Sequence, residues 1–177
     1  MTTIEAGIYT HKSQVFNDAV NMPLAPEYKV LSEQMRDLGY YCVNIMGCPS
    51  LHYTGAGRGY DRQIINSYAQ RVYEGVERTI EQLEAFGECD QFLLLHVLDV
   101  HPWPVNMISM PVASQTCLSL EDRLWQTKEK VASVNLKYSP LYAHANMMGV
   151  KNTDRSLGVL FDYLESHYND DEYVVQL

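Results

Sequence analysis

Residues Phe92 to Asn106 read FLLLHVLDVHPWPVN, and this stretch decides how the rest of the chain is interpreted. Its first half is an almost unbroken apolar run, which is typical of a β-strand that is covered on both faces. Together with Gln91, the run predicts a strand over 91–99. Asp99 ends this strand, and His101 follows in a proline-rich loop. The strand therefore presents an acid and a histidine together at its carboxyl end.

The sequence on either side of this strand alternates between helical and strand patterns. The predicted elements are helices at 26–38, 67–86, 119–134 and 139–166, and further strands at 40–46 and 173–177. In the first helix Val30, Leu31, Met35 and Leu38 form one apolar stripe, and Gly39 is placed to end the helix. This alternation predicts an α/β fold with a largely parallel or mixed sheet flanked by helices. Because ligands bind beyond the carboxyl ends of such strands, the end of the 91–99 strand is expected at the edge of a site.

The composition sets limits on partners and location. The chain has 177 residues, enough for one domain, and a formal net charge of −9. Such a charge argues against a nucleic-acid or anionic-membrane surface, which needs a clustered basic face. No apolar run approaches the roughly 20 residues that cross a bilayer, so no membrane span is expected. The first residues show no signal-peptide pattern, and the location is left open, cytoplasmic by default.

A histidine that follows an acid at the end of a central strand is a candidate for anion binding or acid catalysis. The carboxylate of Asp99, or a main-chain carbonyl, can orient the imidazole of His101. The imidazole can then bind an anion or give a proton to a leaving group. On spacing alone, simple packing of His101 under the loop of Trp103 is an equal alternative.

The remaining polar clusters give weaker signals. The glycine-rich loop 47–62 matches neither of the two common phosphate-binding patterns, and it offers only His52 and Arg58 as weak candidates for contacts with an anion. The acids from Asp170 to Glu172 are typical of a solvated turn. The four cysteines have no C-x-x-C spacing. No metal site is therefore assigned within the chain.

Four stretches of the chain, taken in order, carry a resemblance to a known family. They are GIYTHKSQVFND (Gly7–Asp18), LSEQMRDLGYYCVNIMG with GRGYDR (Leu31–Arg62), FLLLHVLDVHPWP (Phe92–Pro104) and YAHANMMGVKNTDRSLGVLFDYLESHYNDDEYVVQL (Tyr142–Leu177). They resemble four segments of the sulfatases of the alkaline phosphatase superfamily. In the same order, the family patterns are T-G-x-Y-P-H-x-H-G-V, L-A-E-x-L-x-x-x-G-Y-x-T-x-x-x-G with R-G-F-D, F-x-x-x-x-x-x-D-x-H-x-P, and Y-x-A-x-I-x-x-x-D-x-x-x-G-x-L-L-x-x-L. The similarity covers nearly the whole chain in the family's order.

The resemblance implies that residues 1–177 are the central part of a single sulfatase-type α/β domain, truncated at both ends, and so an incomplete alkaline-phosphatase-like domain. Sulfatases cleave sulfate esters with a formylglycine nucleophile, made from Cys or Ser in C/S-x-P-x-R, and a divalent cation, usually calcium. The family order puts the nucleophile before Met1 and the metal-binding D-H-G after Leu177. The chain alone is therefore expected to be inactive. The resemblance makes His101 the residue that contacts the sulfate ester and can protonate the leaving alcohol, with Asp99 beside it in the pocket wall.

The chain departs from the family pattern at one contact segment. The family's G-K-x-H, whose lysine and histidine contact the sulfate, matches only as Gly47 with Cys48 in place of the lysine, and His52 is a shifted substitute for the histidine. The favoured ligand is a sulfate-ester small molecule or glycan. Two alternatives stay open: a phosphate- or phosphonate-monoester hydrolase on the same scaffold, and a non-catalytic module that binds an anion or a partner.

Overall fold

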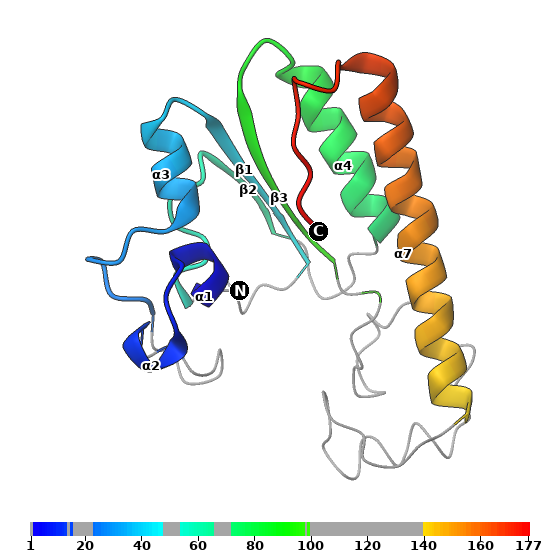
Figure 1. Ribbon diagram of the computed structural model, residues 1–177, viewed down its shortest axis with the longest axis horizontal. Helices are drawn as coiled ribbons and strands as arrows, with labels where there is room; N and C mark the ends of the chain where they lie inside the picture. The colour runs from blue at the N-terminus through cyan, green and yellow to red at the C-terminus, as the bar shows by residue number, and fades with distance from the viewer. Residues whose placement is uncertain are drawn as a thin grey trace. The chain divides into compact units, whose positions relative to one another are not determined.

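The structure is a computed structural model that describes residues 2–13, 15, 23–47, 54–65, 72–97, 99 and 140–177 (Figure 1). The elements in chain order are α1 (Thr2–Ala6), α2 (Thr10–Ser13), α3 (Leu31–Asp37), β1 (Tyr41–Met46), β2 (Arg62–Ile65), α4 (Val72–Ala85), β3 (Gln91–His96) and α7 (Pro140–His167). The chain divides into two compact units. The first unit is Met1–Tyr68 with Glu81–Val97, and the second is Ala69–Ile80 with Leu98–Leu177. The prediction of a single domain stays a prediction.

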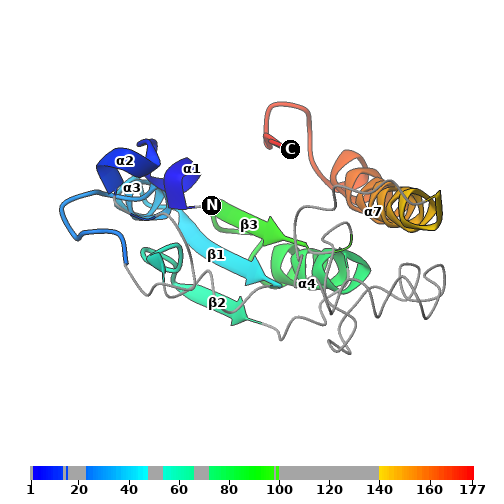
Figure 2. The same cartoon turned by 90° about the horizontal axis from the view of Figure 1, so that it is seen from below.

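A three-stranded parallel sheet, in the order β2-β1-β3, forms the centre of the first unit. Figure 2 shows the three arrows running in the same direction. The register aligns Val43 of the central strand with Arg62 of β2 and with Leu93 of β3. Every residue of β1 after Tyr41 is buried, as expected for a strand with a neighbour on each edge. Helices with parallel strands confirm the predicted α/β class.

The strands predicted over 40–46 and 91–99 are present as β1 and β3, whereas β2 was not predicted. β1 begins one residue later than predicted, and β3 ends at His96 rather than at 99, with all its residues half-buried. β2 directly follows the predicted glycine-rich loop. A polar chain links the two outer strands: Gln82 of α4 accepts a hydrogen bond from Arg62 at 2.6 Å and donates one to Gln91 at 2.9 Å.

The predicted 26–38 helix is shorter in the structure, because α3 begins only at Leu31. Val30 is the residue before its first turn, and the main-chain N–H of Val30 donates to the carboxylate of Glu33 at 3.0 Å. This contact fixes the start of the helix at 30–31 instead of at Pro26. Gly39 has a φ of +97°, which confirms the glycine stop predicted after the helix.

The apolar stripe predicted on this helix is wrong. Val30 is buried, but it precedes the helix, and Leu38 is 74% exposed while Leu31 is also exposed. The buried position within α3 is instead a serine, Ser32, whose main-chain carbonyl accepts a hydrogen bond from the thiol of Cys42. The helical spacing does not apply to all four residues, because α3 spans only Leu31–Asp37 and both Val30 and Leu38 lie outside it.

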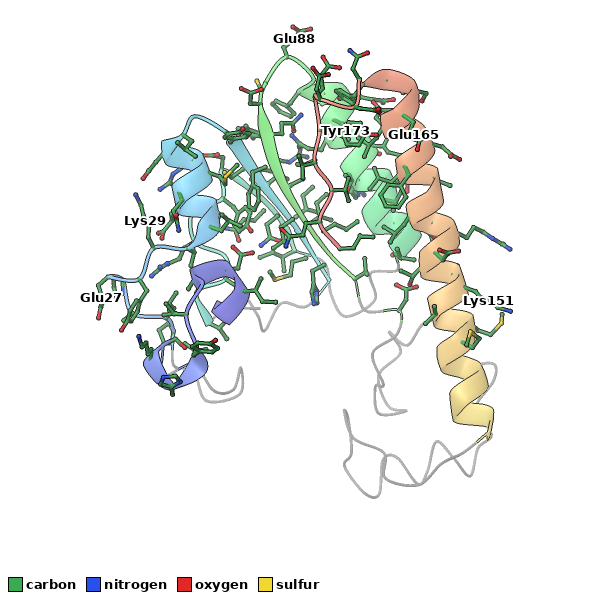
Figure 3. All side chains as sticks on the ribbon, viewed as in Figure 1. Glu27, Lys29, Glu88, Lys151, Glu165 and Tyr173 are labelled. Carbon is green, nitrogen blue, oxygen red and sulfur yellow. The ribbon has the colours of Figure 1, made fainter. Side chains whose placement is uncertain are left out.

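The second unit is dominated by α7, whose start at Pro140 agrees with the helix predicted over 139–166. Ser156, Leu160 and Leu164 recur every four residues and are buried, so they form one face of the helix. Lys151 and Glu165 are exposed and project from the same helix (Figure 3). Among the described helices none is both long enough and apolar enough to cross a membrane.

The last residues differ from the prediction. The segment 173–177 was expected to be a buried strand, but it forms no strand, and Val174 and Leu177 are 96% and 90% exposed. β-branched residues favour a strand only where a neighbouring strand supplies hydrogen bonds, and 173–177 joins no ladder of the described sheet. The predicted helix at 119–134 and the loop that precedes it lie outside the described residues.

Candidate functional site

Asp99, the first of the two residues singled out by the sequence, is almost completely buried, with 1% of its surface exposed. One carboxylate oxygen, Oδ2, accepts a hydrogen bond from the main-chain N–H of Val72 at 2.7 Å. The other, Oδ1, accepts one from the side-chain amide of Asn152 at 3.0 Å. Val72 is the first residue of α4, and the free N–H groups of a helix N-terminus favour a negative charge. The acid therefore joins two helices of the second unit.

Two other residues predicted to contact the substrate are not among those that the structure describes. His101 and His52 both lie outside the described residues, as does Cys48. The catalytic role of His101 and the substrate contacts of His101 and His52 therefore stay predictions. Asp99 is placed, and its two carboxylate oxygens accept hydrogen bonds from the N–H of Val72 and the amide of Asn152.

Arg58 is placed inside the first unit, where its guanidinium braces the chain ahead of α3. Nη1 donates to the carbonyls of Leu24 and Ala25, both at 3.3 Å. Nη2 donates to the carbonyl of Tyr28 and, at 3.2 Å, to the carboxylate of Glu33. An anion at Arg58 would have to compete with these internal acceptors. Its hydrogen bonds indicate a structural role, and the predicted anion contact is without structural support.

The glycines around Arg58 are explained by close packing. Gly59 has a φ of +79°, and a Cβ at this position would lie 2.4 Å from the main-chain nitrogen of Glu33. Gly55 has a φ of +91° and lies against Leu24. Both conformations suit glycine, because a side chain would be strained in each. Gly55 and Gly59 are thus needed for the fold where this segment packs against Leu24 and the start of α3.

A buried acid–tyrosine pair was not found by the sequence reasoning. Glu5 of α1 is only 4% exposed, and its Oε1 accepts a hydrogen bond from the hydroxyl of Tyr60 at 3.3 Å. Burial raises the pKa of Glu5 above its ordinary value, against the smaller lowering effect of this hydrogen bond. Burial, and then the neighbouring Glu5, raise the pKa of Tyr60. Nothing in the sequence around Glu5 marked it as buried, because acids in a first helical turn are usually exposed.

Cys42, on β1, is close enough to Tyr60 to contribute to the raised pKa of that tyrosine. Burial, and then the neighbouring Asp61, raise the pKa of Cys42 to about 11. A thiol with so high a pKa stays protonated at neutral pH and is a poor nucleophile. Cys42 is buried and forms no disulfide.

No group of three or more His, Cys, Asp or Glu side chains suited to a metal ion occurs within the described ranges. The divalent cation implied by the resemblance therefore has no donor set among these residues, and it stays a prediction about sequence outside the chain. Comparison with models of known protein families gave no match, and comparisons with curated proteins and with solved structures also found none.

Proposed function

We propose that the chain is the central segment of a sulfate-ester hydrolase of the sulfatase type, in an alkaline-phosphatase-like domain. The observation that carries the proposal is the DVHPWP stretch from Asp99 to Pro104, which has the family's D-x-H but Trp103 where the family pattern has proline, and which occurs together with three other family-like segments in the family's order. The parallel α/β sheet of the first unit is of the class that such a domain requires.

Within this proposal the chain supplies acid–base and positioning groups. In the complete protein the formylglycine would provide the attacking oxygen, and the divalent cation, when bound, would polarise the sulfate. His101 would contact the ester and give a proton to the alcohol as it leaves. Because the nucleophile and the cation ligands are expected outside these 177 residues, the chain alone should not turn over.

Two measurements test the proposal at its base. The coding sequence on either side should contain a C/S-x-P-x-R upstream and a D-H-G downstream, and the absence of both would refute a sulfatase. The purified 177-residue chain should show neither hydrolysis of 4-nitrophenyl sulfate nor stoichiometric calcium binding. Robust turnover by this chain would contradict the placement of the catalytic groups outside it.

The role of His101 is tested in the longer polypeptide that contains both flanking motifs. His101→Ala should lower kcat for an alkyl sulfate, whose leaving alkoxide needs a proton, by about 10²-fold or more, as expected for loss of a general acid. His167→Gln is the matched control, since His167 is an exposed histidine at the end of α7 and should leave kcat unchanged. Equal activity of the two variants would remove His101 from the mechanism.

A phosphate- or phosphonate-monoester hydrolase on the same scaffold is the second candidate. The lysine that contacts sulfate in the family is replaced by Cys48, so one of the sulfate-binding groups is missing. A threonine in place of the upstream C/S-x-P-x-R nucleophile would favour a phosphate ester. If neither motif is present and the chain unfolds in one sharp transition as a monomer, a non-catalytic module that binds an anion or a partner is the better assignment.

A further inference from the structure

We propose that Asn152 is a positioning residue that acts through Asp99. In this proposal its side-chain amide, together with the N–H of Val72, fixes the chain two residues before His101. The inference rests on the proposed function, because His101 is the residue whose placement matters for sulfate-ester cleavage. It also gives Asp99 a different task from the substrate contact that the sequence predicted.

The three groups come from distant parts of the sequence and lie within the second unit. Asn152 belongs to α7, on the face that continues through Ser156 and Leu160, where the other side chains are buried. A polar amide on a core-facing row needs a partner, and the carboxylate of Asp99 supplies it at 3.0 Å. Asn152 therefore uses a packing position to hold an acid.

The burial of Asp99 determines which task it can perform. With 1% of its surface exposed and each carboxylate oxygen accepting a hydrogen bond, it is poorly placed to contact a substrate. It is well placed to act as an anchor, because hydrogen bonds to an ionised carboxylate are among the stronger ones in proteins. His101 follows two residues later in the sequence, so its Cα lies at most about 7 Å from that of Asp99.

Removing the Asn152 amide should loosen this anchor without unfolding the protein. Asn152→Leu keeps most of the side-chain volume but leaves one oxygen of a buried carboxylate without its donor. The N–H of Val72 would still donate to the other oxygen. Misplacement of a catalytic group by about 1 Å can lower a rate by about 10²-fold. We therefore expect a fall of about 10- to 100-fold in kcat in the longer polypeptide, with a smaller change in KM.

The first test uses the complete 177-residue chain and needs no activity. In Asn152→Leu, amide hydrogen exchange at Val72 and at 99–101 should increase at least about 10-fold, while exchange in β1 is unchanged. Lys151→Ala, an exposed neighbour on α7, is the control and should change neither region. Unchanged exchange at 99–101, or an equal increase throughout the chain, would overturn the proposal.

The second test exchanges donor and acceptor. The double variant Asp99→Asn/Asn152→Asp keeps an acceptor for the N–H of Val72 and an amide–carboxylate hydrogen bond between the same two positions. It should exchange more slowly at 99–101 than either single variant, and in the longer polypeptide it should regain part of the lost kcat. No recovery by either measure would overturn the pairing. If the wild-type longer polypeptide lacks sulfatase activity, the proposed function fails, while the exchange measurements still decide whether Asn152 holds Asp99.

Discussion

Gly59→Ala should destabilise the first unit strongly, because two separate penalties meet at this position. An alanine at a φ of +79° adopts a left-handed conformation, which costs about 1 kcal/mol relative to glycine. Its Cβ would also lie 2.4 Å from the nitrogen and 2.8 Å from the Cα of Glu33. Both are main-chain atoms at the start of α3, so the clash cannot be relieved by rotating a side chain.

The clash has a further consequence because Glu33 holds two contacts. Its carboxylate accepts hydrogen bonds from the N–H of Val30, which begins the helix, and from Arg58. Loss of a helix cap costs about 0.5–2 kcal/mol, and loss of a typical further hydrogen bond about 1 kcal/mol. With the conformational penalty, Gly59→Ala should lower the free energy of unfolding of the first unit by about 2.5–4 kcal/mol.

Two other glycines provide matched controls. Gly39→Ala also places alanine at a positive φ, +97°, but in open space, so it should cost only about 1 kcal/mol. Gly158→Ala lies within α7 with nothing near the added Cβ, and should stabilise the second unit by about 0.5–1 kcal/mol. For Gly59→Ala and Gly39→Ala, urea unfolding is monitored by the labelling of Cys42, which is buried in the first unit. For Gly158→Ala, it is monitored by far-UV circular dichroism. If Gly59→Ala costs no more than Gly39→Ala, the close packing on α3 is refuted.

Three further predictions concern buried polar groups in the first unit. Burial raises the pKa of Glu5, so ionisation of Glu5 opposes folding as the pH rises above 4.5. In urea titrations Glu5→Gln should therefore be as stable as wild type in acid and more stable at neutral pH. The control Glu27→Gln, at an exposed position (Figure 3), should be as stable as wild type at both pH values. Asn44 is completely buried in β1, and neither atom of its side-chain amide is hydrogen-bonded within the described residues. Asn44→Leu should therefore raise the free energy of unfolding by about 1 kcal/mol, measured as a higher melting temperature. A melting temperature below that of wild type would show that Asn44 has a hydrogen-bond partner. In single-cysteine variants Cys89 should react rapidly with a disulfide reagent and Cys42 only on unfolding, and equal rates would contradict the burial of Cys42.

The elements predicted correctly from sequence are those whose signals are local. The apolar runs of β1 and β3, the helical spacing in α4 and α7, and the glycine after α3 each depend on residues close together in the chain. β2 could not be recognised in this way. Its sequence, RQII, is short and half polar, and it becomes a strand because Arg62 to Ile65 pair with Val43 to Met46 of β1.

The segment 173–177 failed for the opposite reason. Its sequence, YVVQL, has strong β propensity, but no described strand pairs with it. Strand formation is a property of two segments, and propensity describes only one of them. The same limit applies to the start of α3, where Glu33 rather than Pro26 decides the first turn.

Candidate site residues were harder to interpret because one residue type can serve two purposes. Arg58 was considered as an anion contact on account of its charge and glycine neighbours, yet its hydrogen bonds go to the carbonyls of the 24–28 segment and to Glu33. Its acceptors are separated from it by at least 25 residues of sequence, and no spacing rule connects them. Sequence could identify Arg58 as important but could not say for what.

The D-x-H pair shows the same division within three residues. The sequence places Asp99 and His101 together after a buried strand, and chemistry alone suggests that both face a ligand. The contacts of Asp99 with Val72 and Asn152 separate their tasks, since an acid held by two helices is fixed, whereas a general acid must reach the leaving group. In the proposed mechanism, an acid held in place two residues before His101 would lower the entropy that is lost when the histidine meets its ester. In the proposed mechanism a buried Asp99 would serve His101 better than an exposed carboxylate, because an exposed carboxylate would repel an anionic substrate.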